Sequence, residues 1–248
     1  ERAFIVTDPI MEQMGYVRKV TDVLDKIGMQ YRIFNQVKPD PDISNINMAL
    51  AQVRPFEPDT FIALGGGSPM DEAKFIWLLY ENPELRFEDV ALRFMDIRKK
   101  ICTFPKLGRK AVMIAIPTTS GSGSEVTPFT VITDDKTGIK YPIADYELTP
   151  DMAIVDPDLV KSMPKTLAAH TGLDAMTHAI EAYTSVFANN YTDGLALEAL
   201  RLIFKYLPDS YHNGAQHPMA REKMHYAATM AGMAFANAFL GVCHSMAH

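Results

Sequence analysis

The sequence has little cysteine, no excess of positive charge and no long hydrophobic run. Its two cysteines, Cys102 and Cys243, are too few for a disulfide framework and too far apart for a Cys-x-x-Cys motif. A formal net charge of −6 provides no basic surface for nucleic acid. No apolar run reaches the roughly 18 residues of a membrane helix, and no signal peptide opens the chain. These absences predict a cytoplasmic protein that binds a small molecule, with neither a nucleic-acid nor a membrane partner.

The composition, 48% hydrophobic and 22% charged, is that of a globular protein with one large core or two smaller ones. The ends read as interior positions. Glu1 is not a start methionine, and the final segment GVCHSMAH has the pattern of mid-helix sequence. We therefore expect a fragment that is truncated at its C-terminus.

The first half alternates short β-rich segments with helical ones, which predicts βαβ units on a parallel sheet. The expected strands are AFIVT, QYRIF, TFIAL and AVMIAIPTT, the expected helices are Met11–Ile27 and Ile43–Val53, and FTVITDDKTGIKYPI has the turn residues of a hairpin. Residues 1–157 are predicted to form a doubly wound α/β dinucleotide-binding domain.

After Pro157 the pattern changes to long Ala-, Leu- and Met-rich stretches with helical spacing. The expected helices are Pro164–Tyr183, Asn190–Tyr206 and Met219–Leu240. Residues 158–248 are predicted to form a second, all-α domain.

Three glycines, Gly65, Gly66 and Gly67, follow the predicted strand TFIAL and precede a predicted helix whose cap is expected to be Ser68. Glycines at such a junction let the backbone approach a pyrophosphate, and the helix N-terminus favours negative charge. A tight turn into a well-capped helix would give the same pattern, and the loop matches neither G-x-G-x-x-G nor a P-loop.

A second loop, IPTTSGSGSEVT, leaves the apolar strand with a series of hydroxyls that includes Thr118, Thr119 and Ser120. Ligands of open α/β sheets collect at the carboxyl edge of the strands, so two such loops together favour a nucleotide site. Lys140, beside the hairpin turn, is a weaker candidate for a cofactor contact, because a lysine in that position is usually only solvated.

Two pairs of side chains have the one-turn spacing that lets both members reach one ion. Asp174 and His178 lie four residues apart in a predicted helix, and His244 and His248 repeat that spacing near the end of the chain. A surface acid–histidine pair or a core histidine would look similar, but two pairs in one apolar helical domain favour a site. Carboxylate plus imidazole suits Fe(II), Zn(II) or Mn(II). Cys243 would point about 100° away from His244, so it is interpreted as packing.

With these residues identified, the chain resembles the iron-activated (group III) alcohol dehydrogenases. GGGSPMDEAK, PTTSGSGSEVT, GLDAMTHAIEAY and GVCHSMAH occur in that family's order and spacing. Within the family the resemblance is greatest to the alcohol dehydrogenase part of bifunctional alcohol/aldehyde dehydrogenases of fermenting bacteria, as in FANAFLGVCHSMAH.

The resemblance implies a dinucleotide-binding domain, a helical metal domain of the dehydroquinate synthase-like type, and catalysis in the cleft between them. It assigns Asp174, His178 and His244 as ligands of Fe(II), with Zn(II) as an alternative, and His248 as a catalytic proton relay. It assigns to NAD(H) the residues Gly65, Gly66, Gly67, Ser68, Asp71, Thr118, Thr119, Ser120 and Lys140.

Two departures from the family pattern matter. A fourth ligand, a histidine, lies in relatives beyond the position where this chain stops. Asn35 stands where NAD-preferring relatives often have an aspartate for the adenosine ribose, so NADP stays open as an alternative.

The expected activity is reduction of a short-chain aldehyde, acetaldehyde to ethanol if an aldehyde dehydrogenase domain is linked upstream. A glycerol-dehydrogenase-like, dehydroquinate-synthase-like or lactaldehyde oxidoreductase is the alternative within the enzymes. From another class, the chain could be an assembly domain that forms homo-oligomers or filaments.

Overall fold

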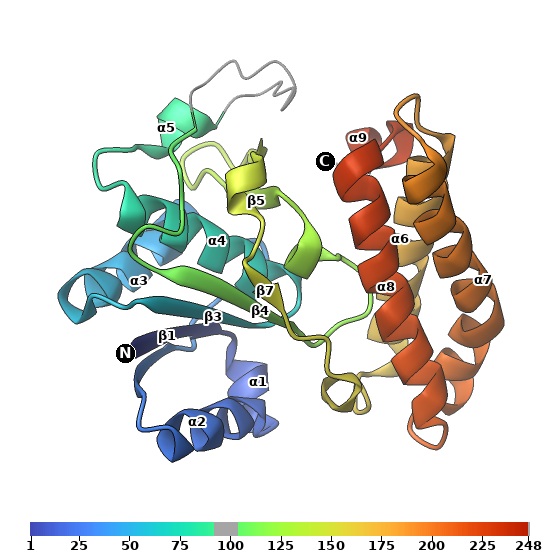
Figure 1. Ribbon diagram of the computed structural model, residues 1–248, viewed down its shortest axis with the longest axis horizontal. Coiled ribbons are helices and arrows are strands. Elements are labelled where there is room, and N and C mark those ends of the chain that lie inside the picture. The colour runs from blue at the N-terminus through green and yellow to red at the C-terminus, as the bar shows by residue number, and fades with distance from the viewer. Residues whose placement is uncertain (92–103, 248) are drawn as a thin grey trace. The chain divides into compact units, whose positions relative to one another are not determined.

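The computed structural model describes residues 1–91 and 104–247 (Figure 1), so Cys102 and the proposed relay His248 lie outside the described residues. The chain forms two compact units. The first comprises residues 1–116 and 128–153, and the second comprises residues 117–127 and 154–248. The sequence placed a single boundary at residue 157. The loop 117–127 instead groups with the helices of the second unit.

The first unit is built on a parallel sheet whose strand order, among the described residues, is β2-β1-β3-β4-β7. The strands are β1 (Arg2–Thr7), β2 (Gln30–Phe34), β3 (Thr60–Gly65), β4 (Val112–Pro117) and β7 (Met152–Ala153). Ala3 pairs with Tyr31 on one side and with Thr60 on the other. All of β3 is buried because helices cover both faces of the sheet, as Figure 1 shows. The predicted doubly wound α/β fold is confirmed.

One predicted helix, Met11–Ile27, is two helices in the structure. α1 (Pro9–Gln13) is capped by the side chain of Asp8, and α2 (Tyr16–Lys26) follows after Gly15, whose φ of 74° is in the left-handed region. A glycine adopts this conformation without steric cost, so the chain turns there and the helix is interrupted.

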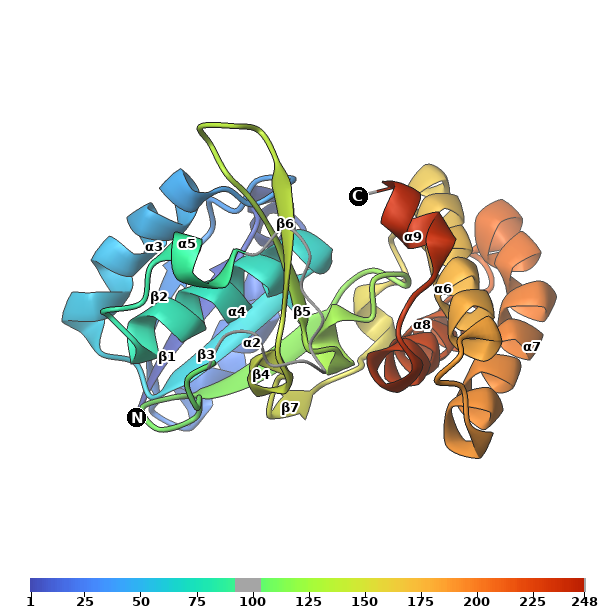
Figure 2. The same cartoon turned by 90° about the horizontal axis from the view of Figure 1, so that it is seen from above.

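The remaining elements of the first unit pack above the sheet or project from it. They are α3 (Ile43–Phe56), α4 (Gly67–Glu81), α5 (Phe87–Val90), the hairpin β5 (Phe129–Thr133) and β6 (Lys140–Ala144), and a 3₁₀ turn, Tyr146–Leu148. The predicted hairpin is confirmed, with Thr130 opposite Ile143 in antiparallel register (Figure 2). Aromatic side chains, among them Phe4, Phe61 and Trp77, fill the core between sheet and helices.

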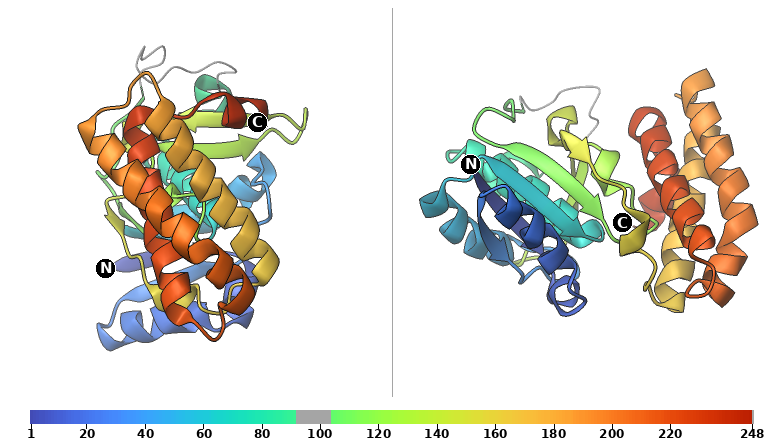
Figure 3. Two further views of the ribbon diagram at one scale, coloured as in Figure 1. Left: turned by 90° about the vertical axis from the view of Figure 1, so that its right-hand side faces the viewer. Right: turned by 60° about the horizontal axis from the view of Figure 1, so that its bottom comes forward.

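The second unit consists mainly of helices. α6 (Lys165–Thr184), α7 (Asn190–Asn213) and α8 (Pro218–Ala238) pack side by side (Figure 3), followed by the short α9 (Val242–Ala247). Two 3₁₀ turns, Ser124–Val126 and Pro157–Leu159, complete the unit. Its core combines larger apolar side chains such as Leu202 and Met224 with the small side chains of Ala175, Ala227 and Ala228, which let the helices approach closely. Within the described residues, no helix has both the length and the apolar character needed to cross a membrane.

Candidate metal and cofactor sites

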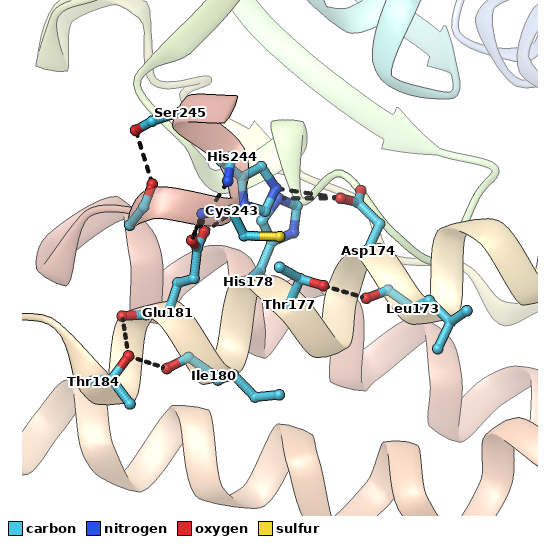
Figure 4. Close-up of polar contacts among 11 residues, drawn as sticks. Leu173, Asp174, Thr177, His178, Ile180, Glu181, Thr184, Cys243, His244 and Ser245 are labelled. Carbon is cyan, nitrogen blue, oxygen red and sulfur yellow. Dashed lines mark hydrogen bonds and ion pairs between the residues drawn. The ribbon is translucent and has the colours of Figure 1, made fainter. Parts of the chain in front are cut away.

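The face of α6 that carries Asp174 and His178 also carries Glu181, because positions i, i+4 and i+7 of a helix lie on one side. α9 brings His244 over this face (Figure 4). The chain reaches that position through a sharp turn at Phe239, whose φ is 66°. The hydroxyl of Ser185, at the end of α6, donates to the Ala238 carbonyl at 2.5 Å and ties this turn to α6.

The three predicted ligands come together. Asp174 Oδ1 lies 3.4 Å from His244 Nε2 and 3.6 Å from His178 Nε2, and the candidate ligand atoms all lie within 4.8 Å of one another. Two atoms that each lie about 2.1 Å from one ion in tetrahedral geometry are about 3.4 Å apart. One carboxylate and two imidazoles at these separations fit a divalent transition-metal ion.

Aromatic stacking fixes the two imidazole rings. The ring of His178 lies between Phe235, at 4.4 Å between centroids, and His244, at 4.5 Å and nearly parallel to it. The side chain of His178 is 6% exposed, that of His244 is 14% exposed, and that of Asp174 is 42% exposed. The cluster therefore has one buried ring, that of His178, one partly buried ring, that of His244, and one carboxylate that reaches solvent.

The pKa values of the two histidines are shifted in opposite directions when no metal is bound. Burial lowers the pKa of His178 to about 4, so its imidazole is neutral near pH 7, which is the form that binds a metal. The hydrogen bond to Asp174 raises the pKa of His244, with Glu181 contributing in the same direction against the opposing effect of burial.

Glu181 is a residue that the sequence reasoning missed. Its Oε2 lies 2.5 Å from His244 Nδ1, and its Oε1 accepts the backbone N–H of Cys243 at 2.7 Å. Burial alone would raise the pKa of Glu181, but the hydrogen bonds from His244 and the backbone of α9 outweigh it and lower that pKa. The i+7 spacing from Asp174 was the signal that could have revealed it.

One expectation about the surroundings of the cluster was wrong. Cys243 is exposed on α9 and does not pack in the interior, because every residue of this short helix except His244 is exposed. The apolar side chains of Leu173 and Ile180, also on α6, are 53% and 43% exposed. They lie on the other side of α6, away from His178.

The glycine turn of the first unit lies where the sheet reverses its winding. Strand order 2-1-3-4 places this switch between β1 and β3, and Gly65–Gly67 follow the carboxyl end of β3. Gly65 has φ 149°, and a Cβ there would lie 2.6 Å from Pro69 Cγ. The turn therefore requires glycine for its own geometry.

The prediction that Ser68 caps the following helix was wrong. α4 begins at Gly67, so Ser68 lies inside the first turn, and the N-cap is Gly66, which has no side chain. No side chain in the described part of the chain caps α4. The N-terminal amides are thus left for solvent or for an anionic ligand.

Three other predicted cofactor residues make contacts within the first unit. Asp71 accepts the backbone N–H of Val131 at 3.0 Å and so ties α4 to β5. Lys140 forms an exposed ion pair with Asp40 at 2.7 Å. Asn35, directly after β2, donates a hydrogen bond to Glu12. These contacts give each residue a structural role, whatever else it binds.

The hydroxyl loop 117–127 packs against the helices of the second unit. Ser120 Oγ lies 3.4 Å from His225 Nδ1, and burial lowers the pKa of His225 to about 4. Thr118 is buried and Thr119 is half-buried. A Cβ at Gly121 or Gly123 would collide with the backbone of α6 at Thr171 or of α8 at Gly232, so the two glycines of this loop allow its close packing on the helices.

We predict that Gly232→Ala destabilises the protein, although alanine is the better helix former by about 1 kcal/mol. A Cβ on Gly232 would lie 3.0 Å from Gly123 Cα and 2.9 Å from Val126 Cγ2. Overpacking of this kind costs about 1–3 kcal/mol. The matched control is Gly194→Ala on α7, where a Cβ meets nothing within 4 Å, so stability should rise there. Urea unfolding of both variants measures whether each substitution lowers or raises the free energy of unfolding. A stabilised Gly232→Ala would show that the loop does not pack tightly on α8.

The features of both units are those of a nucleotide-binding metalloprotein: a glycine turn at a topological switch point, and a carboxylate–histidine cluster on apolar helices. Comparison with known proteins makes this class specific. The family model described as iron-containing alcohol dehydrogenase matches residues 1–157, and the model of its C-terminal part matches residues 168–248. The chain belongs to the iron-containing alcohol dehydrogenase family.

Individual relatives agree with this assignment. The chain is 60% identical over 248 residues to the bifunctional aldehyde-alcohol dehydrogenase AdhE of Escherichia coli, and it spans 28% of that protein's length. It is 48% identical to an NADPH-dependent butanol dehydrogenase of Clostridium saccharobutylicum over 96% of this chain and 58% of that protein. The iron-containing alcohol dehydrogenase structure from Thermococcus thioreducens matches with a TM-score of 0.92 and 39% identity, over 100% of this chain and 63% of that one.

Proposed function

We propose that this chain carries the metal site and the nicotinamide site of an alcohol dehydrogenase that reduces a short-chain aldehyde with NAD(H). The observation that carries the proposal is the convergence of Asp174, His178 and His244 from two separate helices in a member of this family. A divalent ion held there, Fe(II) in the first instance, would act as a Lewis acid on the aldehyde oxygen while reduced nicotinamide supplies hydride.

The residues of the first unit bind the cofactor in this proposal. The turn Gly65–Gly67 lets the pyrophosphate approach the backbone, and the uncapped amides at the start of α4, including that of Ser68, donate to its oxygens. Asn35 follows β2, where an acid would repel the 2′-phosphate of NADP. The amide of Asn35 does not repel this phosphate, so both NADH and NADPH are to be tested. NADH is the cofactor that we expect the enzyme to use.

The loop 117–127 and the end of the chain are assigned further roles. Thr118, Thr119 and Ser120 are proposed to contact the cofactor, held in place by the packing of Gly121 and Gly123 on the helices. Lys140 is retained as a weaker candidate, since Asp40 already neutralises its ammonium group. His248 is proposed to pass a proton to the product alcohol.

Acetaldehyde is the proposed substrate and ethanol the product. The support is the 60% identity to a relative named as a bifunctional aldehyde-alcohol dehydrogenase. In such an arrangement a linked aldehyde dehydrogenase would supply the aldehyde that this chain reduces.

The test is metal-dependent turnover of the full-length protein. We expect chelator-treated protein to lose acetaldehyde-dependent NADH oxidation, and anaerobic Fe(II) to restore it. A panel of compounds defines the substrate class. Propanal, butanal and dihydroxyacetone are tested for reduction by NADH or NADPH, and glycerol is tested for oxidation by the oxidised forms of the two cofactors. Turnover that persists after verified removal of metal would refute the proposal, and restoration by Zn(II) alone with a preference for polyols would favour a glycerol-dehydrogenase-like enzyme.

A further inference from the structure

We infer that Glu181 is a positioning residue for the proposed metal site, because its carboxylate holds His244 in the tautomer whose Nε2 can bind a cation. This inference rests on the proposed metal site and adds to it a residue that touches no ion. Figure 4 shows Glu181 on the far side of the His244 ring from Asp174.

The two nitrogens of His244 have different partners. Nδ1 faces Glu181 Oε2 at 2.5 Å, and Nε2 faces Asp174 Oδ1 at 3.4 Å. An ionised carboxylate accepts hydrogen bonds and cannot donate them, so Nδ1 must carry the proton. In the neutral ring Nε2 then presents its lone pair toward Asp174 and His178, which is the state needed for metal binding.

The other oxygen of Glu181 fixes the backbone that carries His244. Oε1 accepts the N–H of Cys243 at 2.7 Å and lies 3.4 Å from the N of His244. A Cβ on Gly241 would lie 3.0 Å from the same oxygen, so the glycine allows this close approach. Glu181 is 8% exposed, which keeps water from replacing these contacts.

Substitution by glutamine separates the effect on the tautomer from the effect on the backbone. In Glu181→Gln the amide oxygen must face the backbone N–H groups of α9, because two donors cannot share a hydrogen bond. The amide NH₂ then faces His244 Nδ1, which has to become an acceptor. Nε2 would take the proton and could no longer bind a cation.

Glu181→Ala removes both contacts but imposes no tautomer. If Glu181 positions the ring, the affinity for Fe(II) should fall by about 10- to 100-fold in Glu181→Gln. The loss of affinity in Glu181→Ala should be equal or smaller. For thermal stability we expect the opposite order: Glu181→Gln should be more stable than Glu181→Ala, because glutamine still accepts the N–H of Cys243. A purely structural role would give both measurements the same order, with glutamine closer to wild type.

The experiment titrates metal-free full-length protein with Fe(II) under anaerobic conditions against a chromophoric chelator, and records thermal unfolding of each variant. Glu198→Gln is the control, because Glu198 pairs with Arg201 on the exposed surface of α7 and should bind Fe(II) like wild type. Wild-type affinity in Glu181→Gln, or an affinity order that follows stability, would overturn the inference. Failure of the wild-type protein to bind Fe(II) would overturn the proposed metal site itself, and the inference with it.

Discussion

Replacing His244 by alanine is expected to remove most of the bound metal and to reduce kcat/KM for the aldehyde by about a thousandfold or more. Lewis-acid stabilisation of a developing alkoxide is worth several kcal/mol, and each 1.36 kcal/mol corresponds to a factor of ten in rate. Only Asp174 and His178 would then remain of the three-residue cluster. Their atoms lie on one helix, one turn apart, and cannot enclose an ion from two sides.

The fold should survive this substitution. α9 is fastened to α6 through the carboxylate of Glu181 and the backbone N–H of Cys243, and neither group belongs to the His244 side chain. His178 would lose one stacking partner and keep Phe235. Circular dichroism and the thermal unfolding curve should therefore change little while the metal content falls.

His212→Ala is the matched control for His244→Ala. His212 lies exposed on α7, outside the cluster, so its removal should leave metal content and turnover at the wild-type level. Metal content is measured by elemental analysis after dialysis, and turnover by NADH absorbance. Wild-type metal content and activity in His244→Ala would exclude His244 as a ligand.

Local spacing made part of this site predictable. Asp174 and His178 lie one turn apart on a helix, so the sequence alone shows that both can reach one point. The convergence of α9 on α6 depends on the turn at Phe239 and on the contact between Ser185 and Ala238. Neither is visible in a local pattern, so the place of His244 rested on the family resemblance.

Features that depend on contacts between distant segments were missed for the same reason. The glycines of the 117–127 loop have the composition of a ligand-binding loop, but Gly121 and Gly123 are required by the backbone of helices that follow much later in the chain. The role of Glu181 becomes apparent only once α9 is placed over it. Composition and periodicity fix which residues face one another within an element, and they do not fix which elements meet.

The strands of the sheet, in contrast, were predictable because burial on both faces gives continuous apolar runs. β3 is buried along its whole length. The helix that follows it, α4, carries a fully buried glutamate, Glu72. Its environment has a consequence for stability that composition does not reveal.

Glu72 is expected to make the protein less stable as the pH rises from about 4.5 to 7. Its carboxyl is fully buried against Asn45, whose Nδ2 lies 2.8 Å from Oε1 and 3.1 Å from Oε2. The pKa of Glu72 is raised from 4.5 to about 7, mainly by burial and to a smaller extent by Asp42, while Asn45 and Lys38 oppose the shift.

The direction of this change in stability with pH follows from proton binding. Between these two pKa values the folded protein holds a proton that the unfolded chain has released, so the free energy of unfolding decreases with pH and levels off above about 7. At roughly 1.4 kcal/mol per pKa unit, the loss across this interval is on the order of 3 kcal/mol. Glu72→Gln, which has no proton to lose, should be similar to wild type near pH 4.5 and more stable above pH 7.

Urea unfolding followed by the fluorescence of Trp77 measures this difference, since Trp77 is the only tryptophan of the chain and lies on the same helix as Glu72. The relevant quantity is the free energy of unfolding of Glu72→Gln minus that of wild type, at intervals from pH 4.5 to 8. Glu84→Gln, at an exposed position beyond the end of α4, controls for the loss of one negative charge and should give a difference that does not vary with pH. A difference for Glu72→Gln that is equally flat would mean that Glu72 is ionised in the folded protein throughout this range, and that Asn45 and its neighbours compensate the buried charge.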